Sequence, residues 1–400
     1  MTAYQRKVLL STSAGIALEN MDILFLAFSL SSIITTFGIS GTQAGLIATI
    51  TNLGMLVGGI FFGLMADKHG RVKIFSYTVL LFSIASLLMF FASNIYFVYL
   101  FRFIAGIGAG GEYGACMALI AESIPKKQLG RASSIAGVGA QVGAALAAIL
   151  ASLIIPTLGW KMLYVIGVLP VLMVLVIRRD LKEPTAFQQN DTTNQTSRLR
   201  DLFATRQLAI QTIGLSTMVT VQIAGYFGLM NWLPSIMQKQ LGLSVSGSSI
   251  WMISTIVGMS LGMLTFGVVM DKIGPRLAFA MFLLCSAASV YLLVFATNKL
   301  TLIVAAVIVG YFINGMYGGY GAVISSLYPT ANRATANNFI MNVGRAIGGF
   351  SSIIIGFLID HYSLTAVILF LSAIYLVSLV VALTLPGMKQ ANFSQKVVIE

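Results

Sequence analysis

Long hydrophobic segments alternate with short clusters of charged and turn-forming residues along the whole chain. Stretches free of Asp, Glu, Lys and Arg, such as 74–101 and 207–238, exceed the roughly 20 residues that a helix needs to cross a bilayer. Division at Gly, Pro, Asn and charged residues predicts twelve helices. Their ranges are 8–37, 42–66, 72–92, 95–123, 132–155, 161–179, 207–237, 246–270, 276–296, 300–327, 334–358 and 363–385.

The composition indicates that these helices use lipid as their solvent. Hydrophobic residues make up 58% of the 400 positions and charged residues 9%, with a mean hydropathy of +0.92, which one soluble core could not bury. Arg6 and Lys7 precede an apolar run, as in a signal peptide, but Glu19 and Asp22 interrupt that run, so we expect an uncleaved first helix. The two cysteines fall in different predicted helices and suggest neither a disulfide framework nor a metal site.

The basic residues indicate the orientation of the chain. With helix ends assigned alternately from a cytoplasmic N-terminus, 19 of the 24 Lys and Arg residues fall in inner loops and tails. The positive-inside rule therefore predicts a multi-pass protein of the inner (plasma) membrane with both termini in the cytoplasm. This topology explains the net charge of +12, so no nucleic-acid partner is expected.

A loop motif of glycine, aspartate and arginine occurs twice, with 204 residues between its aspartates, Asp67 and Asp271 (271 − 67). A pair of glycines four residues apart also repeats, at an offset of 205 residues (344 − 139). Such pairs also let helices approach closely in lipid, but nearly equal offsets favour duplication. The repeated positions are Gly63, Asp67, Gly70 and Arg71 with Gly267, Asp271, Gly274 and Arg276, and Gly139 and Gly143 with Gly344 and Gly348.

One extended polar segment divides the chain near its middle, and we interpret it as a cytoplasmic linker. The predicted fold is an all-α integral membrane protein with 12 transmembrane helices in two pseudo-symmetric six-helix halves. The predicted domains are the N-terminal half at 1–179, the linker at 180–206, the C-terminal half at 207–386 and a cytoplasmic tail at 387–400.

These motifs resemble those of the major facilitator superfamily across essentially the whole chain. The Gly63 to Arg71 loop is similar to the family signature between the second and third helices, and the Arg102 to Gly111 stretch is similar to its fourth-helix signature. The resemblance implies the fold of that family and transport by alternating access.

Within the superfamily, the stretch from Gly111 to Gly114 and the segment at 121–132 look like those of proton-coupled symporters of organic acids. Residues 156–170 are particularly similar to bacterial sialic acid permeases, whereas 328–335 resemble aromatic-acid and nicotinate transporters. Those symporters usually carry two aspartates three residues apart in the first helix, where this chain has Glu19 and Asp22. Leu129 replaces the basic residue of the sugar-porter signature, which weakens a sugar interpretation.

Five ionisable residues are expected at membrane depth, where a charge costs several kcal/mol unless it meets water or a partner. Glu19 and Asp22 share one helix face, where repulsion and desolvation favour a proton on one of them. We predict proton coupling through Asp22, with Glu19 and Glu112 as further candidates. Two alternatives stay open: one of these carboxylates merely pairs with an intramembrane Arg, and Glu112 pairs with Arg102, which we predict to be structural or a relay.

The fifth of these residues, Arg345, continues a predicted helix face with Asn338 and Asn342. A fixed guanidinium charge beside two amides suits a carboxylate with neighbouring hydroxyls. The alternative is an Arg neutralised by Glu19, Asp22 or Glu112 to hold the halves together. The predicted substrate-binding residues are Arg345, Asn342, Asn338, Gln222, Tyr226, Asn314 and Tyr317.

A second group of charged residues lies at the inner ends of the predicted helices. Charge-paired helix ends can form and break as the halves rock, and the family resemblance implies that they stabilise the outward-open state. The alternative is a role in topology alone. The predicted gating or structural residues, with Arg102, are Asp67, Arg71, Glu122, Arg131, Asp271, Arg276 and Arg333.

The sequence thus predicts a monomeric secondary transporter that takes up a small organic anion, such as a sialic acid or an aromatic or monocarboxylate, with protons. No cofactor or metal is expected beyond the proton as coupling ion. The alternative of the same fold is a proton-coupled drug or metabolite efflux antiporter, which would give Arg345 no evident purpose. A non-transporting scaffold or receptor would need no proton-sensitive carboxylates, and an enzyme is least expected because nothing resembles a catalytic constellation.

Overall fold

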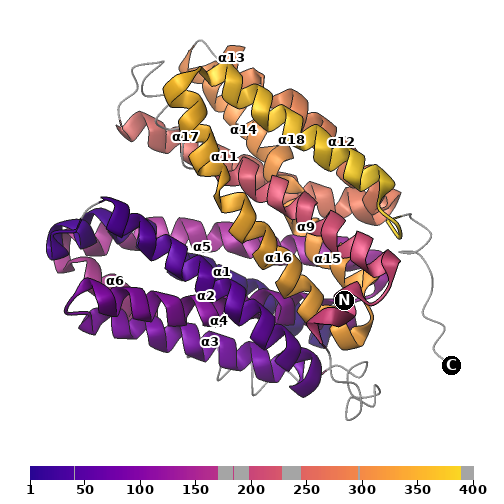
Figure 1. The fold of residues 1–400 in the computed structure, drawn as a ribbon, viewed down its shortest axis with the longest axis horizontal. Coiled ribbons are helices and arrows are strands. Elements are labelled where there is room, and N and C mark those ends of the chain that lie inside the picture. The colour runs from indigo at the N-terminus through magenta and orange to yellow at the C-terminus, as the bar shows by residue number, and fades with distance from the viewer. Residues whose placement is uncertain (40, 170–182, 184–197, 228–244, 296–297, 389–400) are drawn as a thin grey trace. The chain divides into compact units, whose positions relative to one another are not determined.

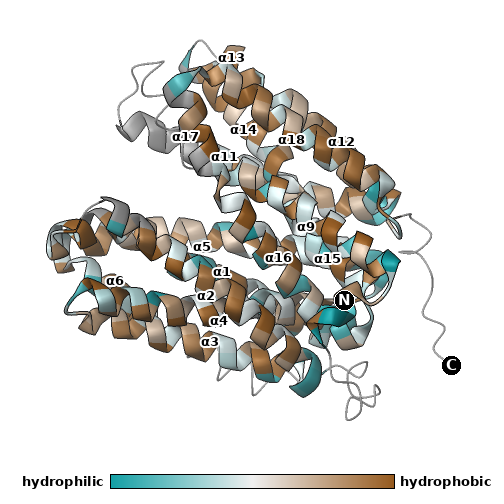
Figure 2. Cartoon of the chain, viewed as in Figure 1, coloured by the Kyte–Doolittle hydropathy of each residue, from teal (hydrophilic) through white to brown (hydrophobic). Residues whose placement is uncertain are grey.

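A computed structural model describes residues 1–39, 41–169, 183, 198–227, 245–295 and 298–388. All regular structure in these ranges is helical (Figure 1). Ten of the described helical segments are long and apolar enough to cross a membrane. Figure 2 shows hydrophobic residues along most of α12 and α18, with hydrophilic residues mainly at helix ends. The chain is therefore a multi-pass membrane protein.

The helices follow one another along the chain without a strand in the described ranges. They are α1 (Ala3–Phe37), α2 (Gly41–His69), α3 (Arg71–Leu88), α4 (Ile95–Ser123), α5 (Leu129–Leu158), α6 (Trp160–Ile166), α9 (Arg206–Phe227), α11 (Val245–Ile273), α12 (Pro275–Ser289), α13 (Leu292–Phe295), α14 (Lys299–Gly315), α15 (Tyr317–Leu327), α16 (Arg333–Gly349), α17 (Ser351–His361) and α18 (Leu364–Thr384).

Most helix ranges agree with the sequence predictions, but three predicted helices are each divided in two. The helix predicted at 276–296 is interrupted between Ser289 and Leu292. The helix predicted at 300–327 breaks at Met316, and that predicted at 334–358 breaks at Phe350. Glycines flank the breaks at Met316 and Phe350, and glycine lowers the stability of a continuous helix. Most of the predicted linker at 180–206 and of the tail at 387–400 lies outside the described residues.

The duplicated loop has the same backbone turn in both copies. Gly70 separates α2 from α3 with φ of 108°, and Gly274 separates α11 from α12 with φ of 86°. Residues with a Cβ atom rarely adopt this conformation, so both copies require glycine at this position. The repeat seen in the sequence is therefore a repeat of local structure.

The described helices form two compact units, with boundaries that differ from the predicted halves in two short segments. Unit 1 comprises Met1–Pro125, Ala136–Phe203 and Ile324–Asn342, and unit 2 comprises Lys126–Ile135, Ala204–Val323 and Val343–Glu400. The start of α5 thus belongs to unit 2, and the start of α16 belongs to unit 1.

Glycines bring the backbones of neighbouring helices into close contact in each unit. In unit 1 a Cβ atom at Gly58 of α2 would overlap the carbonyl oxygen of Ile107 in α4. In unit 2 a Cβ atom at Gly262 of α11 would overlap the carbonyl oxygen of Tyr311 in α14. Gly58 and Gly262 stand 204 residues apart (262 − 58), so the two helix pairs are equivalent. The sequence predicted this use of glycine for Gly139 and Gly143, where a Cβ atom would overlap the carbonyl oxygens of Ser13 and Ala17 in α1.

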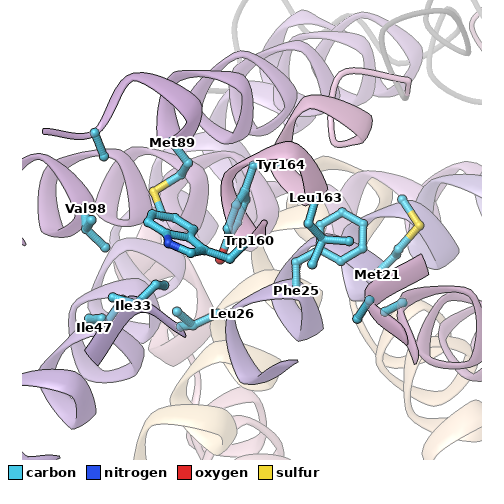
Figure 3. Close-up of a cluster of buried hydrophobic side chains, with 13 residues drawn as sticks. Met21, Phe25, Leu26, Ile33, Ile47, Met89, Val98, Trp160, Leu163 and Tyr164 are labelled. Carbon is cyan, nitrogen blue, oxygen red and sulfur yellow. The ribbon is translucent and has the colours of Figure 1, made fainter. Parts of the chain in front are cut away.

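A cluster of buried hydrophobic side chains lies in unit 1 and includes residues of α1 and α6 (Figure 3). The ring of Tyr164 meets those of Phe25 and Trp160 edge to face, with centroids 6.1 and 6.0 Å apart. The Tyr164 hydroxyl lies 3.0 Å from the Ser29 hydroxyl, which satisfies a buried polar group. The labelled members are Met21, Phe25, Leu26, Ile33, Ile47, Met89, Val98, Trp160, Leu163 and Tyr164.

Candidate functional site

An ion pair is buried inside unit 1 between α1 and α4. The Nη1 atom of Arg102 lies 3.1 Å from Oδ2 of Asp22, and both side chains are almost completely buried. The hydroxyl of Ser86 in α3 donates a hydrogen bond to the other carboxylate oxygen of Asp22. Groups from two helices thereby compensate the charge of Asp22. The sequence analysis left open that one of the carboxylates pairs with an intramembrane Arg, and Asp22 does so.

Arg102 has hydrogen-bonding capacity beyond this ion pair. Its Nε and Nη2 atoms are buried without a hydrogen-bond partner among the described residues. The guanidinium group therefore contacts Asp22 through one edge only, and the remaining N–H groups are available if the surrounding helices move.

Two carboxyl groups, those of Glu112 and Glu19, also lie close together in unit 1, on the same two helices as the ion pair. Glu112 of α4 is completely buried, and neither of its carboxyl oxygens has a hydrogen-bond partner in the described part of the chain. Glu19 of α1 is close enough to interact electrostatically with it. Gly15 of α1 leaves the space that the Glu112 carboxyl occupies, because a Cβ atom there would overlap Oε1.

Five of the seven predicted substrate-binding residues lie in unit 2 and make polar contacts there. Nη2 of Arg345 in α16 donates to the Tyr317 hydroxyl at 3.2 Å. Tyr226 of α9 interacts electrostatically with both Arg345 and Tyr317. Nε2 of Gln222 in α9 donates to Oδ1 of Asn314 in α14 at 2.9 Å. Arginine, phenol and amide groups from α9, α14, α15 and α16 therefore make polar contacts with one another within one unit.

The other two predicted substrate-binding residues, Asn338 and Asn342, contact the main chain of α4 in unit 1. Nδ2 of Asn338 donates to the carbonyl oxygen of Gly111 at 3.1 Å, and its Oδ1 accepts from the N–H of Gly114 at 2.6 Å. Nδ2 of Asn342 donates to the carbonyl oxygen of Gly110 at 3.0 Å. Both amides thus bind protein backbone in this structure.

The first loop motif anchors a cluster of buried charges at one end of unit 1. The carboxylate of Asp67 accepts the main-chain N–H groups of Ala334 and Thr335, at 3.0 and 2.8 Å, in the first turn of α16. It also pairs with Arg71 at 3.1 Å. A carboxylate at a helix N-terminus satisfies unpaired N–H groups and interacts favourably with the helix dipole.

Glu122 extends this cluster. Its Oε1 atom lies 3.1 Å from Arg71 Nη2 and 3.3 Å from Arg333 Nη1. Nη2 of Arg71 also donates to the carbonyl oxygen of Thr330 at 2.5 Å. The structure therefore brings together four of the predicted gating residues, Asp67, Arg71, Glu122 and Arg333.

The second copy of the loop motif makes the equivalent helix cap in unit 2. The carboxylate of Asp271 accepts the N–H groups of Gly130 and Arg131, at 2.8 and 3.0 Å, in the first turn of α5. Gly130 stands 204 residues before Ala334 (334 − 130), so each aspartate caps the corresponding helix. Arg276 makes a separate contact in unit 2, in which its Nη2 atom donates to the carbonyl oxygen of Leu385 at 2.7 Å.

The two copies differ in their ion pairs. The Nε atom of the Arg131 side chain lies 4.0 Å from Oδ2 of Asp271, and this side chain is half exposed. Ser326 stands 204 residues after Glu122 (326 − 122), so the second half of the sequence has a serine at the position of the bridging carboxylate. The buried charge cluster is therefore a feature of the first copy.

Sequence reasoning missed two residues that touch these groups. One is Ser86, whose partner Asp22 lies on another helix. The other is Glu183, whose carboxylate accepts the N–H groups of Arg71 and Lys73 at the start of α3, at 2.8 and 3.1 Å. Neither contact has a spacing signal in the sequence, because each joins segments distant along the chain.

The Major Facilitator Superfamily model matches residues 10–261 and, in a second alignment, residues 215–397. Together the two matches span nearly the whole chain. They also agree with the duplicated loop, the equivalent glycine contacts and the paired helix caps described above.

Bacterial proteins named for transport are similar to the chain over nearly its full length. A Haemophilus influenzae protein whose name proposes metabolite transport is 36% identical, covering 96% of this chain and 97% of its own. The sialic acid transporter NanX of Escherichia coli is 31% identical, covering 96% and 95%. The cis,cis-muconate transport protein of Acinetobacter baylyi is 30% identical, covering 91% and 90%.

Among solved structures, the proton:xylose symporter XylE matches with a TM-score of 0.79 and 16% sequence identity, over 94% of this chain and 95% of that chain. This likeness confirms the predicted fold. The relatives are transporters and not enzymes, and those named here give no support to the efflux alternative. The chain belongs to the Major Facilitator Superfamily of membrane transporters.

Proposed function

We propose that the protein takes up a small organic anion, such as a sialic acid or an aromatic or other monocarboxylate, together with protons. Alternating access moves both solutes, with Arg345 holding the carboxylate and Glu112 carrying the proton. The protein works as a monomer in the inner (plasma) membrane with both termini in the cytoplasm, and the proton is its coupling ion without a further cofactor.

The observation that carries the anion assignment is the polar group around Arg345 in unit 2. Its guanidinium stays charged at any physiological pH, and it donates to the Tyr317 hydroxyl at 3.2 Å. With Tyr226, Gln222 and Asn314 in the same unit, this fixed charge suits a carboxylate that carries neighbouring hydroxyl or ring groups. The names of the sialic acid and muconate transporters support the same class of substrate.

Glu112 is the preferred proton carrier because its buried carboxyl oxygens lack hydrogen-bond partners among the described residues. The energy of such a group changes strongly when it gains or loses a proton, as proton coupling requires. Asp22 already meets Arg102 and Ser86, which compensate its charge. In the proposed cycle, Glu112 takes a proton on the outside, the anion binds at Arg345, and both leave on the inside.

Liposomes that contain the purified protein and an internal pH dye test this proposal. Sialic acid, aromatic carboxylates, nicotinate and short hydroxy acids are added one at a time. Proton entry that depends on one of them would support anion symport and identify the substrate class. Silence across the panel, with the protein shown to be folded, would reject it.

The Arg345→Gln variant tests the binding role. Loss of a charged hydrogen bond costs about 1.5–3 kcal/mol, so the apparent affinity for the anion should fall at least about tenfold. Arg206→Gln is the matched control, because Arg206 is exposed at the start of α9. Equal affinities of the two folded variants would exclude Arg345 from the substrate site.

A further inference from the structure

We propose that Asn338 and Asn342 are positioning residues that hold the turn of α4 bearing Glu112 and so link its protonation to the engagement of α16. This inference rests on the proposed role of Glu112 as proton carrier. We call the two asparagines the amide clamp. They lie one helical turn apart on α16 and are buried together with Glu112.

The amide clamp engages both ends of a single helical turn. In an α-helix the N–H of residue 114 is directed at the carbonyl oxygen of residue 110. Here the N–H of Gly114 donates to Asn338 Oδ1 at 2.6 Å, and the carbonyl oxygen of Gly110 accepts from Asn342 Nδ2 at 3.0 Å. Asn338 Nδ2 adds a third bond, to the carbonyl oxygen of Gly111. Side-chain groups inserted at such a turn change the local helix geometry.

Glu112 lies within the clamped turn, and its side chain leaves α4 on the opposite side. At 100° per residue, Gly110, Gly111 and Gly114 share one face of α4, while Glu112 projects roughly 150° away. That direction agrees with the contact of its carboxyl with Gly15 of α1. Movement of α16 against the glycine face would therefore shift the opposite face that carries the carboxyl.

The neighbouring glycines fit the amide clamp closely. A Cβ atom at Gly59 of α2 would overlap Nδ2 of Asn342. A Cβ atom at Gly63, the first glycine of the loop motif, would lie 3.3 Å from Nδ2 of Asn338. A Cβ atom at Gly114 would lie 2.5 Å from Cγ of Asn338. The clamp therefore occupies space left free by Gly59 and Gly114 and packs tightly against Gly63.

The same helix carries the proposed anion-binding residue. Arg345 follows Asn342 by three residues on α16, on the helix face that includes Asn338. A movement of Arg345 when the anion binds can therefore be transmitted along α16, which is one continuous helix, to the turn of α4 that carries Glu112. This gives the two asparagines a role in coupling the anion and the proton, in place of direct contact with the anion.

Infrared titration of the purified protein tests the amide clamp without a substrate. The carbonyl stretch of the protonated Glu112 carboxyl is assigned by its loss in Glu112→Gln, and its intensity is followed against pH. Asn338→Leu keeps the approximate size of the side chain but removes all its hydrogen bonds. We expect its titration midpoint to move by about one pH unit towards acid, because a looser turn admits water that favours the charged carboxylate.

Asn337→Leu is the matched control, since Asn337 is buried on the same helix but its amide bonds Ser325 and the carbonyl oxygen of Arg333. Its midpoint should stay unchanged. Asn342→Ala removes one hydrogen bond of the amide clamp and should shift the midpoint less, in the same direction. This variant provides the test if Asn338→Leu does not fold. Equal midpoints in wild type and the clamp variants, or no titrating Glu112 band, would overturn the inference.

The result separates the clamp from the proposed function. A shifted midpoint with no anion-driven proton entry in wild-type liposomes would retain the clamp and reject symport. Anion-driven proton entry with unshifted midpoints would retain symport and reject the clamp.

Discussion

The buried pair of Asp22 and Arg102 places opposite charges where water cannot solvate them. Removing two charges from water costs several kcal/mol per ion, and their attraction offsets this only with good geometry and additional hydrogen bonds. Ser86 supplies one such bond to Asp22. The stability of the pair therefore depends on keeping both members charged together.

Asp22→Asn should destabilise the protein strongly, because it leaves the buried Arg102 charge without its anion. Breaking such a pair costs about 3–5 kcal/mol, whereas Ser86→Ala should cost only about 1–3 kcal/mol for one hydrogen bond. Thermal unfolding in detergent measures the order of the two. The double variant Asp22→Asn, Arg102→Met should recover part of the loss, and no recovery would show that the pair is not the source of the effect.

The sequence identified these charged residues but not their partners. An ionisable side chain in an apolar segment stands out by its cost in lipid, so Glu19, Asp22, Arg102, Glu112 and Arg345 could be selected without a structure. Which carboxylate meets Arg102 depends on the rotation of α1 and α4 about their axes, and hydrophobicity all round these helices leaves that rotation undefined. The two asparagines illustrate the same limit, since their helix face was evident but the α4 backbone opposite them was not.

At the scale of the helices, close backbone approach at glycines helps to hold neighbouring helices together in each unit. Lipid removes most of the hydrophobic drive for helix association, so packing at small residues has to supply it. One such contact in unit 1 joins Gly58 to Ile107, and the equivalent one in unit 2 joins Gly262 to Tyr311. The existence of the helices and most of their boundaries could be predicted from the lengths of the hydrophobic segments. The breaks at Met316 and Phe350 could not, because glycine occurs both at packing sites and at helix ends.

Gly58→Ala should lower the thermal unfolding midpoint, because the added methyl group overlaps the Ile107 carbonyl oxygen and forces α2 and α4 apart. Overpacking of this kind costs about 1–3 kcal/mol. Gly349→Ala is the control, since a Cβ atom there meets nothing within 4 Å, and it should leave the midpoint unchanged or raise it. Equal midpoints for the two variants would argue against glycine-mediated contact of α2 and α4.

At the scale of the whole chain, duplication has preserved the helix caps and changed the charges around them. Asp67 caps α16 and Asp271 caps α5, so the loop of each sequence half binds a helix from the other half. The 204-residue offset made the repeat visible in the sequence, but the reciprocal capping could not be derived from it. A loop aspartate carries no information about which helix N-terminus it will meet.

The two aspartates should therefore differ in the cost of removing their charge. Asp67→Asn weakens the α16 cap and also breaks the buried pair with Arg71, for which about 3–5 kcal/mol is typical. Asp271→Asn weakens an equivalent cap, but its 4.0 Å contact with half-exposed Arg131 contributes only about 0–1 kcal/mol. Thermal unfolding should thus show a larger shift for Asp67→Asn. Asp201→Asn is the control, because Asp201 accepts one main-chain N–H, from Arg198, outside both motifs. If the two motif variants shift equally, capping alone accounts for their contribution, and the buried cluster around Glu122 adds no stability to the first copy.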